Sequence, residues 1–507
     1  MPEVTLSSLL SPIPVLETVG DMRRTVRGVA YDSRDVEPGF LFVAMDGIHT
    51  DGHRFVPDAV ARGAVAVIHS RPVTPRPEGV TLVRVEDPRA CLSPVAAAFW
   101  SHPSRSIKVI GVTGTDGKSS TVWFITQLLG FLGHRTGFLS TVSFLIGDEV
   151  VKNPFRQSTP ESTEIQGMMR GMVEGGKEFV VVEATSHGLS KKTNRLGDVL
   201  FDAAVFTNVT HEHLEFHGTF EQYRSDKANL FRALSPESRK DVRCPRVGVV
   251  NADDPSAPYF RDACRVPVAS YGVRGPADLG ARDIRSGIGG SDFLMTDAGG
   301  AAAARINIPG PFWVPNALAA CLTVARVLEV PPLSVAPLVE RLKGVKGRME
   351  YVDLGQPFAV IVDYAHTPGA FATLFPWVRA HTQGRLGVVF GSAGERDHEK
   401  RPMQGKVAGD LCDFVVITDE DPRGDDRMGI LEQIAAGCTA KTRGRDLFLI
   451  PDRAEAIRHA LSRARPGDTV MLLGKGHEAS IIGPNGPSQW DERAVAEEAL
   501  RGLGYGT

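Results

Sequence analysis

The sequence predicts an α/β protein of three domains, and two observations carry this prediction. The chain has 507 residues, which is too many for a single hydrophobic core. From residue 108 onward, short runs of valine, isoleucine and leucine alternate with longer stretches of helical periodicity. This alternation is typical of parallel sheets whose strands are joined by crossover helices. It pauses after a predicted helix at 315–330 and restarts from residue 347, so we expect separate central and C-terminal domains.

The first predicted domain covers residues 1–104 and is a small α/β unit. Its expected strands are 29–34, 39–45 and 64–68, and a short helix is expected at 55–61. The segment His102-Pro-Ser-Arg105 is a plausible linker to the next domain, because proline and small polar residues interrupt regular structure.

The central domain is predicted to cover residues 105–345 and to hold a mostly parallel sheet. Its expected strands are 109–112, 179–183, 203–208 and 247–251. The last three end in Glu183, Asn208 and Asn251. Ligands of open α/β sheets bind at the carboxyl ends of the strands, so these polar ends should lie around one site. Residues 287–303 are rich in glycine and alanine and are expected to be a loop or hairpin.

The first strand of this domain leads into Gly111-Val-Thr-Gly-Thr-Asp-Gly-Lys-Ser-Ser-Thr121, followed by a helix at 122–132 with one apolar face. Strand, glycine loop, Lys-Ser and helix form the arrangement that holds phosphates with backbone N–H groups. Lys118 would reach the terminal phosphates, and the Ser119 hydroxyl would bind Mg²⁺. Val112 stands where the general spacing has glycine, so this is a variant loop. A merely structural glycine turn is the less favoured reading, because Lys-Ser-Ser-Thr opens the helix.

The C-terminal domain is predicted at 346–507 as a doubly wound sheet without a phosphate loop of its own. Its expected strands are 359–363, 386–390, 414–417, 447–450 and 470–473. Polar residues follow these strands in Asp363-Tyr-Ala-His366, Gly391-Ser-Ala-Gly-Glu-Arg396, Asp419-Glu-Asp-Pro-Arg423 and Gly474-Lys-Gly-His-Glu478. A second ligand site is therefore expected at the carboxyl edge of this sheet.

The composition is that of an ordinary globular protein, with 42% hydrophobic and 23% charged residues. The net charge of −3 gives no reason to expect nucleic-acid binding. The six cysteines are scattered, which indicates reduced thiols rather than a metal site. The N-terminus lacks a basic segment followed by an apolar one, and no apolar run approaches the roughly 18 residues that span a bilayer. These features predict a cytoplasmic protein without membrane insertion.

Three ionisable residues of the central domain are candidates for chemistry. Glu183 ends a strand next to the phosphate loop, where an acid can hold Mg²⁺ directly or through water. His213 lies in a polar segment after the next strand and is a candidate metal ligand. Lys227 is on a predicted helix, and a free ammonium beside Mg²⁺ would be repelled. It is therefore either a surface charge or a chemically altered side chain.

Several motifs in fixed order give the chain a family resemblance. They are Gly114-Thr-Asp-Gly-Lys-Ser119, Glu183-Ala-Thr-Ser-His-Gly188, Phe206-Thr-Asn208 with His213, Lys227, Asn251-Ala-Asp-Asp254, Gly347-Arg-Met-Glu350, Asp363-Tyr-Ala-His-Thr-Pro368, Lys400-Arg-Pro402 and Gly474-Lys-Gly-His-Glu478. Together they resemble the Mur ligase family, and within it the tripeptide-forming type. The resemblance runs over nearly the whole chain, from Asp32-Ser-Arg34 to Glu478.

The resemblance implies an N-terminal UDP-MurNAc-binding domain, a central P-loop ATPase domain and a Rossmann-like C-terminal domain for the amino acid. The implied reaction is ATP-dependent and Mg²⁺-dependent. It adds a diamino acid to UDP-MurNAc-L-Ala-D-Glu through an acyl phosphate, as a step of peptidoglycan precursor synthesis. The protein would act as a monomer. The diamino acid would be meso-diaminopimelate, L-lysine or L-ornithine.

The resemblance also implies residue roles. ATP would contact Gly114, Thr115, Asp116, Gly117, Lys118, Ser119, Ser120, Asn316 and Arg348. The metal would be held by Ser119, Glu183, His213 and Lys227, with Lys227 carbamylated so that its charge becomes negative. The implied catalytic set is Lys118, Glu183, His213 and Lys227. Trp313 and Glu212 depart from the family pattern, which usually has asparagine and aspartate there.

The substrates would be bound at both ends of the chain. The muramoyl dipeptide and its nucleotide would contact Ser33, Ser158, Thr159, Thr185 and Arg195, although two extra residues precede Arg195. The amino acid would contact Arg396, Glu420, Asp421, Arg423, Gly474 and Glu478. Arg423 suits a distal carboxylate, whereas Asp421 replaces the asparagine of diaminopimelate enzymes and suits a plain ammonium group. These two clues leave the amino acid open.

Three other functions remain as alternatives at this point. Another Mur-type or a folylpolyglutamate-type amide ligase would share the central domain, but the Asp-Ser-Arg unit and the Glu-Asp-Pro-Arg turn argue against it. A P-loop phosphotransferase would not need a second sheet domain, and a guanine-binding Asn-Lys-x-Asp run is absent. A non-catalytic nucleotide-binding scaffold is least favoured, because the catalytic set is complete.

Overall fold

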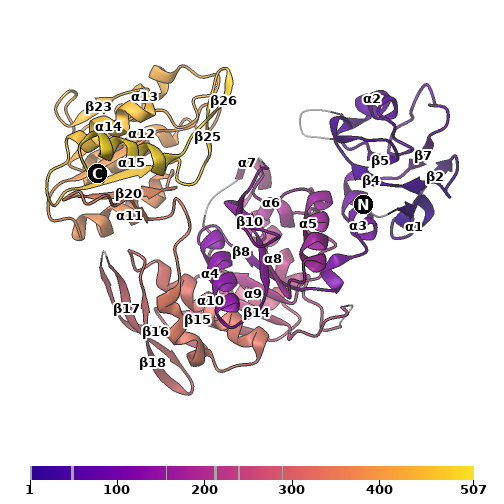
Figure 1. Cartoon of the computed structure of the whole chain (residues 1–507), viewed down its shortest axis with the longest axis horizontal. Helices are drawn as coiled ribbons and strands as arrows, with labels where there is room; N and C mark the ends of the chain where they lie inside the picture. Colours follow the sequence, from indigo (N-terminus) through magenta and orange to yellow (C-terminus); the bar gives the residue numbers. More distant parts are fainter. Residues whose placement is uncertain are drawn as a thin grey trace. The chain divides into compact units, whose positions relative to one another are not determined.

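The computed structural model describes residues 3–46, 51–155, 157–210, 214–237, 240–287 and 289–506, without the side chains of residues 214 and 215. By internal contacts the chain divides into two compact units. The first comprises residues 1–284, 292–306 and 312–342, and the second comprises 285–291, 307–311 and 343–507. Figure 1 shows the elements of both units along the chain.

The N-terminal sheet of the first unit has the strand order β2-β7-β6-β5-β4, with β2 antiparallel and the other pairings parallel. Its strands are β2 (Glu17–Val19), β4 (Gly28–Ala30), β5 (Phe40–Val43), β6 (Ala66–His69) and β7 (Thr81–Arg84), beside the short pair β1 (Val4–Thr5) and β3 (Thr25–Val26). Its helices are α1 (Leu6–Leu10), η1 (Ser33–Asp35), η2 (Gly52–Phe55), α2 (Val56–Ala61), α3 (Pro88–Phe99) and η3 (Pro103–Arg105).

Alternating side chains of this sheet face two hydrophobic clusters, as the period of two in a strand requires. Leu41, Val43 and Ile68 pack with residues of α1 and α3, whereas Phe42 and Val67 pack with α2. The N-terminal part is therefore a sheet with helices on both faces, and this confirms the predicted small α/β domain.

The central sheet has the order β11-β10-β9-β12-β8-β13-β14-β15-β16-β17-β18. From β9 to β16 the pairings are parallel. Its strands are β8 (Lys108–Thr113), β9 (Thr136–Leu139), β10 (Ser143–Leu145), β11 (Val151–Lys152), β12 (Phe179–Glu183), β13 (Ala203–Phe206), β14 (Val247–Asn251), β15 (Val268–Gly272), β16 (Leu279–Gly287), β17 (Gly290–Asp297) and β18 (Gly300–Ile306). The predicted loop or hairpin at 287–303 thus includes the β17–β18 connection.

Helices cover this sheet. They are α4 (Lys118–Phe131), α5 (Ser162–Glu174), α6 (Ser186–Leu189), α7 (Leu214–His217), α8 (Phe220–Arg232), α9 (Ala257–Ala263), α10 (Trp313–Leu328) and η4 (Pro332–Arg341). Residues of α5, α8 and α9 share one hydrophobic cluster with β8, β12, β13 and β14. Helix α4 packs on α10, where the rings of Phe124 and Trp313 lie 5.9 Å apart. Because β8 lies between β12 and β13, the carboxyl ends of these three strands are neighbours.

The second unit has the sheet order β19-β20-β24-β21-β22-β23, parallel except for β19. Its strands are β19 (Glu350–Tyr351), β20 (Ala359–Asp363), β21 (Leu386–Phe390), β22 (Phe414–Ile417), β23 (Leu447–Leu449) and β24 (Thr469–Leu473), with the hairpin β25 (Ser480–Gly483) and β26 (Gly486–Gln489). Its helices are α11 (Pro368–Ala380), α12 (Lys400–Leu411), α13 (Arg427–Ala435), α14 (Arg453–Ser462) and α15 (Glu492–Gly502).

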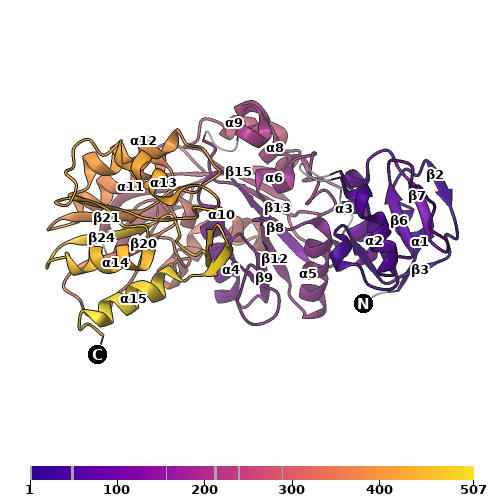
Figure 2. The same cartoon turned by 90° about the horizontal axis from the view of Figure 1, so that it is seen from above.

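Helices α14 and α15 pack on one face of this sheet, and α11, α12 and α13 lie on the other (Figure 2). This arrangement confirms the doubly wound C-terminal domain. The exact boundaries 1–104, 105–345 and 346–507 stay a prediction.

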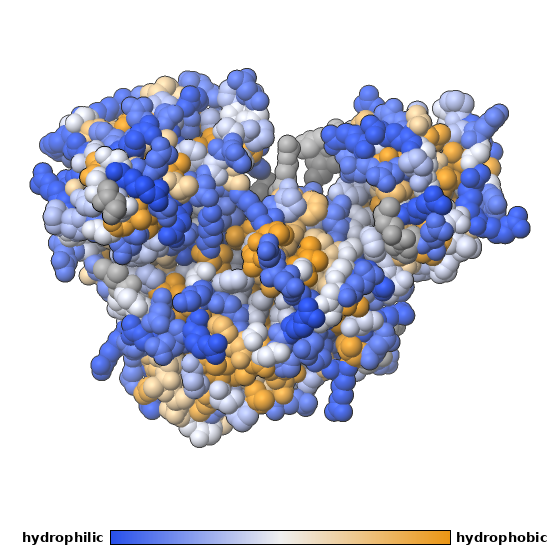
Figure 3. Space-filling view, viewed as in Figure 1, coloured by the Kyte–Doolittle hydropathy of each residue, from blue (hydrophilic) through white to orange (hydrophobic). Residues whose placement is uncertain are grey.

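Hydrophilic residues predominate over the N-terminal and C-terminal sheets on the face seen in Figure 3. Among the described residues, no helix is long and apolar enough to cross a bilayer.

Candidate active site

The phosphate loop lies between β8 and α4, and two of its glycines are sterically required. Gly114 has φ +153° and Gly117 has φ +80°. A Cβ atom at Gly114 would lie 1.8 Å from the Thr207 hydroxyl oxygen, and one at Gly117 would lie 2.6 Å from Oδ1 of Asn316. A side chain at either position would therefore deform the loop. The predicted ATP-contacting residue Asn316 is thus brought to the start of α4.

The loop is held by Thr207 and Asn208, which directly follow the neighbouring strand β13. The backbone N–H of Thr115 donates to the carbonyl of Asn208 at 2.8 Å, and that of Asp116 donates to the Asn208 side chain at 2.9 Å. The Thr207 hydroxyl donates to the Asp116 carbonyl at 2.6 Å. These bonds fix the loop before any ligand binds, which reduces the entropy lost on phosphate binding.

Lys118 opens α4, and its ammonium donates to the Thr115 carbonyl at 2.6 Å. Its side chain therefore folds over the loop that it follows. A phosphate oxygen is a stronger acceptor than this neutral carbonyl, because the bond would then be charge-assisted on both sides.

Glu183 lies at the end of β12 and is only 3% exposed. Its carboxylate accepts from the Ser119 hydroxyl at 2.8 Å, and from the backbone N–H and hydroxyl of Thr141 at 2.9 and 2.8 Å. The predicted neighbourhood of Ser119 and Glu183 is thus present. Thr141 was not anticipated, because nothing in its local sequence marks it.

Lys227 lies on α8 and is 1% exposed, so it is not a surface charge. Its ammonium donates to the Gly114 carbonyl at 2.6 Å and lies 4.4 Å from the centre of the Tyr223 ring. The Tyr223 hydroxyl in turn contacts the Thr115 hydroxyl at 3.1 Å. Three of the four predicted catalytic residues therefore surround the phosphate loop. The fourth, His213, lies outside the described residues.

Two predicted substrate residues meet beside Glu183. The Thr159 and Thr185 hydroxyls are 2.8 Å apart, and the Thr159 hydroxyl also reaches the Glu183 carbonyl at 3.2 Å. Thr185 caps α6 by accepting from the Gly188 backbone N–H at 3.2 Å. Ser158 precedes this pair and is half-buried. These contacts bring the 158–159 segment and the start of α6 to the same edge of the sheet.

Arg195 bonds to protein groups of that edge. Its guanidinium donates to the Thr159 carbonyl at 2.9 Å and to the Glu161 carboxylate at 3.0 Å. Glu161 is 3% exposed and also binds Arg89 of α3 at 2.8 Å. Arg195 thus holds the backbone of Thr159 in place, and its predicted contact with the muramoyl dipeptide stays a prediction. Sequence reasoning missed Glu161, whose pairing depends on α3 and α5 packing together.

Ser33 belongs to the N-terminal part of the chain, in the segment that follows β4 of the N-terminal sheet, and is 7% exposed. It begins the short helix η1, which Asp32 caps by accepting from the Arg34 backbone N–H at 2.9 Å. The Asp-Ser-Arg segment is therefore a well-defined turn at the end of a strand.

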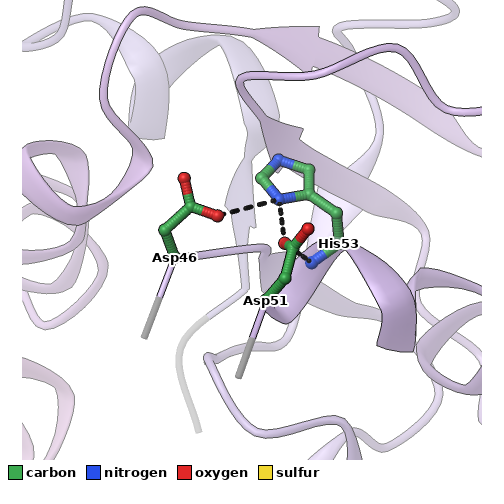
Figure 4. A group of neighbouring side chains, drawn as sticks. All are labelled: Asp46, Asp51 and His53. Atoms are coloured by element: carbon green, nitrogen blue, oxygen red, sulfur yellow. Dashed lines mark hydrogen bonds and ion pairs between the residues drawn. The ribbon is translucent and has the colours of Figure 1, made fainter. Parts of the chain in front are cut away.

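A cluster of Asp46, Asp51 and His53 lies in the same N-terminal part (Figure 4). Both carboxylates are bound by the guanidinium of Arg71, at 3.0 and 2.7 Å. Nε2 of His53 accepts from the Ser70 backbone N–H at 3.1 Å, so Nδ1 carries the proton and donates to Asp51 at 2.8 Å. A cation would have to displace both this proton and Arg71, and the donor set therefore does not suit a metal.

In the second unit, the predicted amino-acid residues Glu420 and Asp421 follow β22. Asp421 accepts from the Lys475 ammonium at 2.8 Å and from the Ile482 backbone N–H at 2.9 Å. Lys475 is fully buried and also pairs with Glu478 at 2.5 Å. The charge of Asp421 is therefore compensated inside the domain. This was not visible in the sequence, where Asp421 had suggested a free negative charge.

Among the predicted amino-acid residues, two side-chain polar atoms lack an internal partner in the described part of the chain. They are Oε2 of Glu420 and Nε of Arg423, and both are buried. Burial raises the pKa of the Glu420 carboxyl, against the charges of Lys400, Lys475 and Arg453. Burial also raises the pKa of Glu478, against Lys475. Gly474 lies beside Glu420, since a Cβ there would be 3.3 Å from Oε2. These buried, unpartnered polar atoms are candidates for hydrogen bonds to a ligand, and the predicted amino-acid contacts stay a prediction.

Three further residues singled out in the sequence have these surroundings. Arg348 lies over the Tyr364 ring, 4.6 Å from its centre, and burial raises the pKa of Tyr364. Arg396 is exposed. Trp313 is 3% exposed and packs on Phe124 as a core residue.

These features define a class. A glycine loop precedes a helix, a buried carboxylate accepts from the Ser119 hydroxyl, and a buried lysine donates to a backbone carbonyl of the loop. This arrangement belongs to a P-loop enzyme that acts on nucleoside phosphates. The family descriptions "Mur ligase family, catalytic domain", "Mur ligase middle domain" and "Mur ligase, glutamate ligase domain" match residues 25–100, 112–324 and 347–476. The chain belongs to the Mur ligase family, and the protein is thus an ATP-dependent ligase.

Similar proteins extend over almost the whole chain. A UDP-N-acetylmuramyl-tripeptide synthetase of Roseiflexus sp. is 51% identical, over 95% of this chain and 96% of its own. A UDP-N-acetylmuramoyl-L-alanyl-D-glutamate–2,6-diaminopimelate ligase of Geobacillus kaustophilus is 38% identical, over 98% of this chain and 100% of its own. A solved structure of an enzyme with the latter name has a TM-score of 0.67 at 26% identity and covers 99% of this chain and 100% of its own.

Proposed function

We propose that the protein joins a diamino acid to the D-glutamyl carboxylate of UDP-MurNAc-L-Ala-D-Glu, with ATP converted to ADP and phosphate. The observation that carries the proposal is the buried set of Ser119, Glu183 and Lys227 around the phosphate loop. It occurs in a chain that matches tripeptide synthetases over 95% of its length. Such a ligase takes part in peptidoglycan precursor synthesis and works as a cytoplasmic monomer.

The first step needs a carboxylate to attack the γ-phosphate of ATP, although both are anionic. The loop amides and Lys118 would bind the phosphates and reduce this repulsion. Carboxylate oxygen becomes bonded to phosphorus, ADP leaves, and an acyl phosphate results. Thr159 and Thr185, which share a hydrogen bond at 2.8 Å, would bind the muramoyl side so that the carboxylate reaches the phosphate.

Mg²⁺ would supply positive charge that offsets the repulsion between ATP and the substrate carboxylate. The residues present fit such an ion, because the Ser119 hydroxyl and the Glu183 carboxylate already converge at 2.8 Å and are hard oxygen donors. Lys227 fits only if it is carbamylated, since its ammonium would repel the metal. We therefore include the carbamate in the proposal, with His213 as a further ligand.

In the second step the amine attacks the acyl carbon, and phosphate leaves with the oxygen that it received. The buried Oε2 of Glu420 would accept from a substrate ammonium group, and Nε of Arg423 would donate to a carboxylate. Because Lys475 compensates Asp421, the acid at position 421 does not by itself favour lysine or ornithine over diaminopimelate.

The proposal is tested with purified protein, ATP, Mg²⁺ and UDP-MurNAc-L-Ala-D-Glu, and with diaminopimelate, lysine or ornithine in turn. Mass spectrometry of the nucleotide-linked product should show a tripeptide with one of the three, in step with phosphate release. The Lys118→Ala variant should form none. Phosphate release without tripeptide from any of them would contradict the assignment and favour a sister ligase.

A further inference from the structure

Three helices meet at a buried hydrogen-bonded chain that the catalytic set does not include. Nδ1 of His217 lies 2.8 Å from the Asp226 carboxylate, and Nε2 lies 3.1 Å from the Ser186 hydroxyl. Their exposed fractions are 4% for His217, 3% for Asp226 and 2% for Ser186. The three residues come from α7, α8 and α6, so the chain joins elements that are separate in sequence.

The partners fix the direction of each bond. Oδ1 of Asp226 accepts from the Gln222 side-chain amide at 3.0 Å, while Oδ2 faces His217. A carboxylate only accepts, so Nδ1 of His217 carries the proton and donates. In the neutral imidazole, Nε2 is then the acceptor for the Ser186 hydroxyl. The side-chain polar groups of Ser186, His217 and Asp226 therefore all have partners. This is the condition under which a buried network stabilises one geometry.

The two ends of this chain adjoin the candidate active site. Ser186 directly follows Thr185, whose hydroxyl contacts Thr159 at 2.8 Å. Asp226 directly precedes Lys227, whose ammonium reaches the Gly114 carbonyl at 2.6 Å. The Asn229 side chain also donates to the Leu189 carbonyl at 3.0 Å, which ties α8 to the end of α6.

We propose that Asp226, His217 and Ser186 are positioning residues that hold Thr185 and Lys227 in register across α6 and α8. This inference rests on the proposed function, because Thr185 and Lys227 have their roles from it. His217 acts by orienting the first residue of α6, and Asp226 acts by fixing the orientation and tautomer of His217. A displacement of about 1 Å at a reacting group costs on the order of 100-fold in rate, so small errors in this register matter.

The same three residue types form the nucleophilic triad of hydrolases, and burial separates the two readings. A nucleophilic serine needs an open side for its substrate, whereas Ser186 is 2% exposed and lies in the first turn of a helix. Ser186 is therefore a structural donor to His217. Labelling of Ser186 by a fluorophosphonate probe in the native protein would overturn this reading.

The test compares Ser186→Ala, His217→Ala and His217→Asn with wild type in the tripeptide assay. His217→Asn keeps a donor for Asp226 but not the acceptor for Ser186. We expect Ser186→Ala and His217→Ala each to raise the KM for the muramoyl dipeptide and to lower kcat, by about 10- to 100-fold in kcat/KM. The KM for ATP should stay within about twofold. His217→Asn should resemble Ser186→Ala.

His134→Ala is the matched control, because His134 pairs with Glu178 at 3.0 Å on the surface of the same unit. It should leave every constant unchanged. The double variant Ser186→Ala/His217→Ala should be no worse than His217→Ala, since both remove one contact. Additive losses, or equal changes in the KM values for ATP and dipeptide, would contradict the positioning role. Ser186→Ala keeps the test valid if His217→Ala does not fold.

A second measurement does not depend on activity. In protein labelled with ¹⁵N-histidine, the His217 Nδ1 proton should be protected from exchange and shifted downfield, and Asp226→Ala should abolish this signal. If wild type shows the signal but forms no tripeptide, the proposed function fails while the hydrogen-bonded chain stands. If wild type forms tripeptide and Ser186→Ala is unaffected, the positioning inference fails.

Discussion

At the scale of single residues, the candidate site depends on polar groups that are buried yet satisfied. Glu183 accepts from Ser119 and Thr141, and Lys227 donates to Gly114. Burying such groups is costly unless each has a partner. Their burial beside the phosphate loop therefore favours a role in ligand binding over one in stability.

Replacement of Lys227 by alanine should abolish ligation, with a loss in kcat of at least about 100-fold, because the negative ligand at this position would be missing. Short-chain carboxylic acids should restore part of the activity by placing a carboxylate in the space left. The exposed Lys406→Ala variant should behave as wild type in the same phosphate-release assay. Full activity of Lys227→Ala would remove the carbamate from the account.

The negative charge of Glu420 should lower the stability of the fold and strengthen binding of the diamino acid. Burial raises its folded-state pKa above the ordinary 4.5, so the stability linked to the neutral form is present at low pH and is lost as pH rises through the folded pKa. Glu420→Gln should therefore raise the unfolding temperature at pH 8 and leave it nearly unchanged below pH 4.5. It should also raise the KM for the diamino acid by roughly 10- to 100-fold, through loss of a charged partner.

Thermal unfolding at both pH values, with kinetics at pH 8, measures these effects. Glu432→Gln is the control, because this exposed carboxyl pairs with Arg443, which lowers its pKa. A lower unfolding temperature of Glu420→Gln at pH 8 would show that its charge stabilises the fold.

At the scale of elements, two glycines at the two ends of helix α4 have opposite expectations: Gly117 is the residue before its first turn, and Gly130 is near its end. Gly117 has φ +80° and no room for a Cβ, so Gly117→Ala should weaken ATP binding and destabilise the protein. Gly130, near the end of the same helix, has nothing within 4 Å of the added Cβ. Gly130→Ala should stabilise by about 0.5–1 kcal/mol with unchanged ATP binding. Nucleotide titration and denaturant unfolding test both, and normal ATP binding by Gly117→Ala would contradict the assigned loop.

The strand ends of the second unit are held by a buried arginine at the start of α14. Arg453 donates to the carbonyls of Asp419 and Leu473 at 3.0 and 2.7 Å and pairs with the fully buried Glu492. These carbonyls directly precede Glu420 and Gly474. Glu492→Ala should destabilise the protein by about 3–5 kcal/mol, because it leaves Arg453 buried and unpaired. Glu497→Ala, on α15 like Glu492, removes partly exposed pairs with Arg493 and Arg501 and should cost under about 1 kcal/mol. Equal losses in denaturant unfolding would contradict this account.

At the scale of the whole molecule, the sequence predicted what depends on strand order and loop spacing. The apolar runs predicted β12, β14, β20, β21 and β22 with their observed bounds. The meeting of Ser119 with Glu183 followed from two adjacent strand ends. Contacts that depend on side-chain direction could not be predicted. Lys475 neutralises Asp421, Arg195 pairs with Glu161, and His217 joins Ser186 to Asp226, and each of these needs the packing of segments far apart in the chain.

The central claim is that a substrate carboxylate becomes an acyl phosphate before the amide forms. It is tested most directly with UDP-MurNAc-L-Ala-D-Glu that carries ¹⁸O in both oxygens of the reacting carboxylate. The account predicts that each phosphate released contains one ¹⁸O atom and that the new amide carbonyl retains the other. Tripeptide formation with unlabelled phosphate, or with ¹⁸O in AMP, would contradict it.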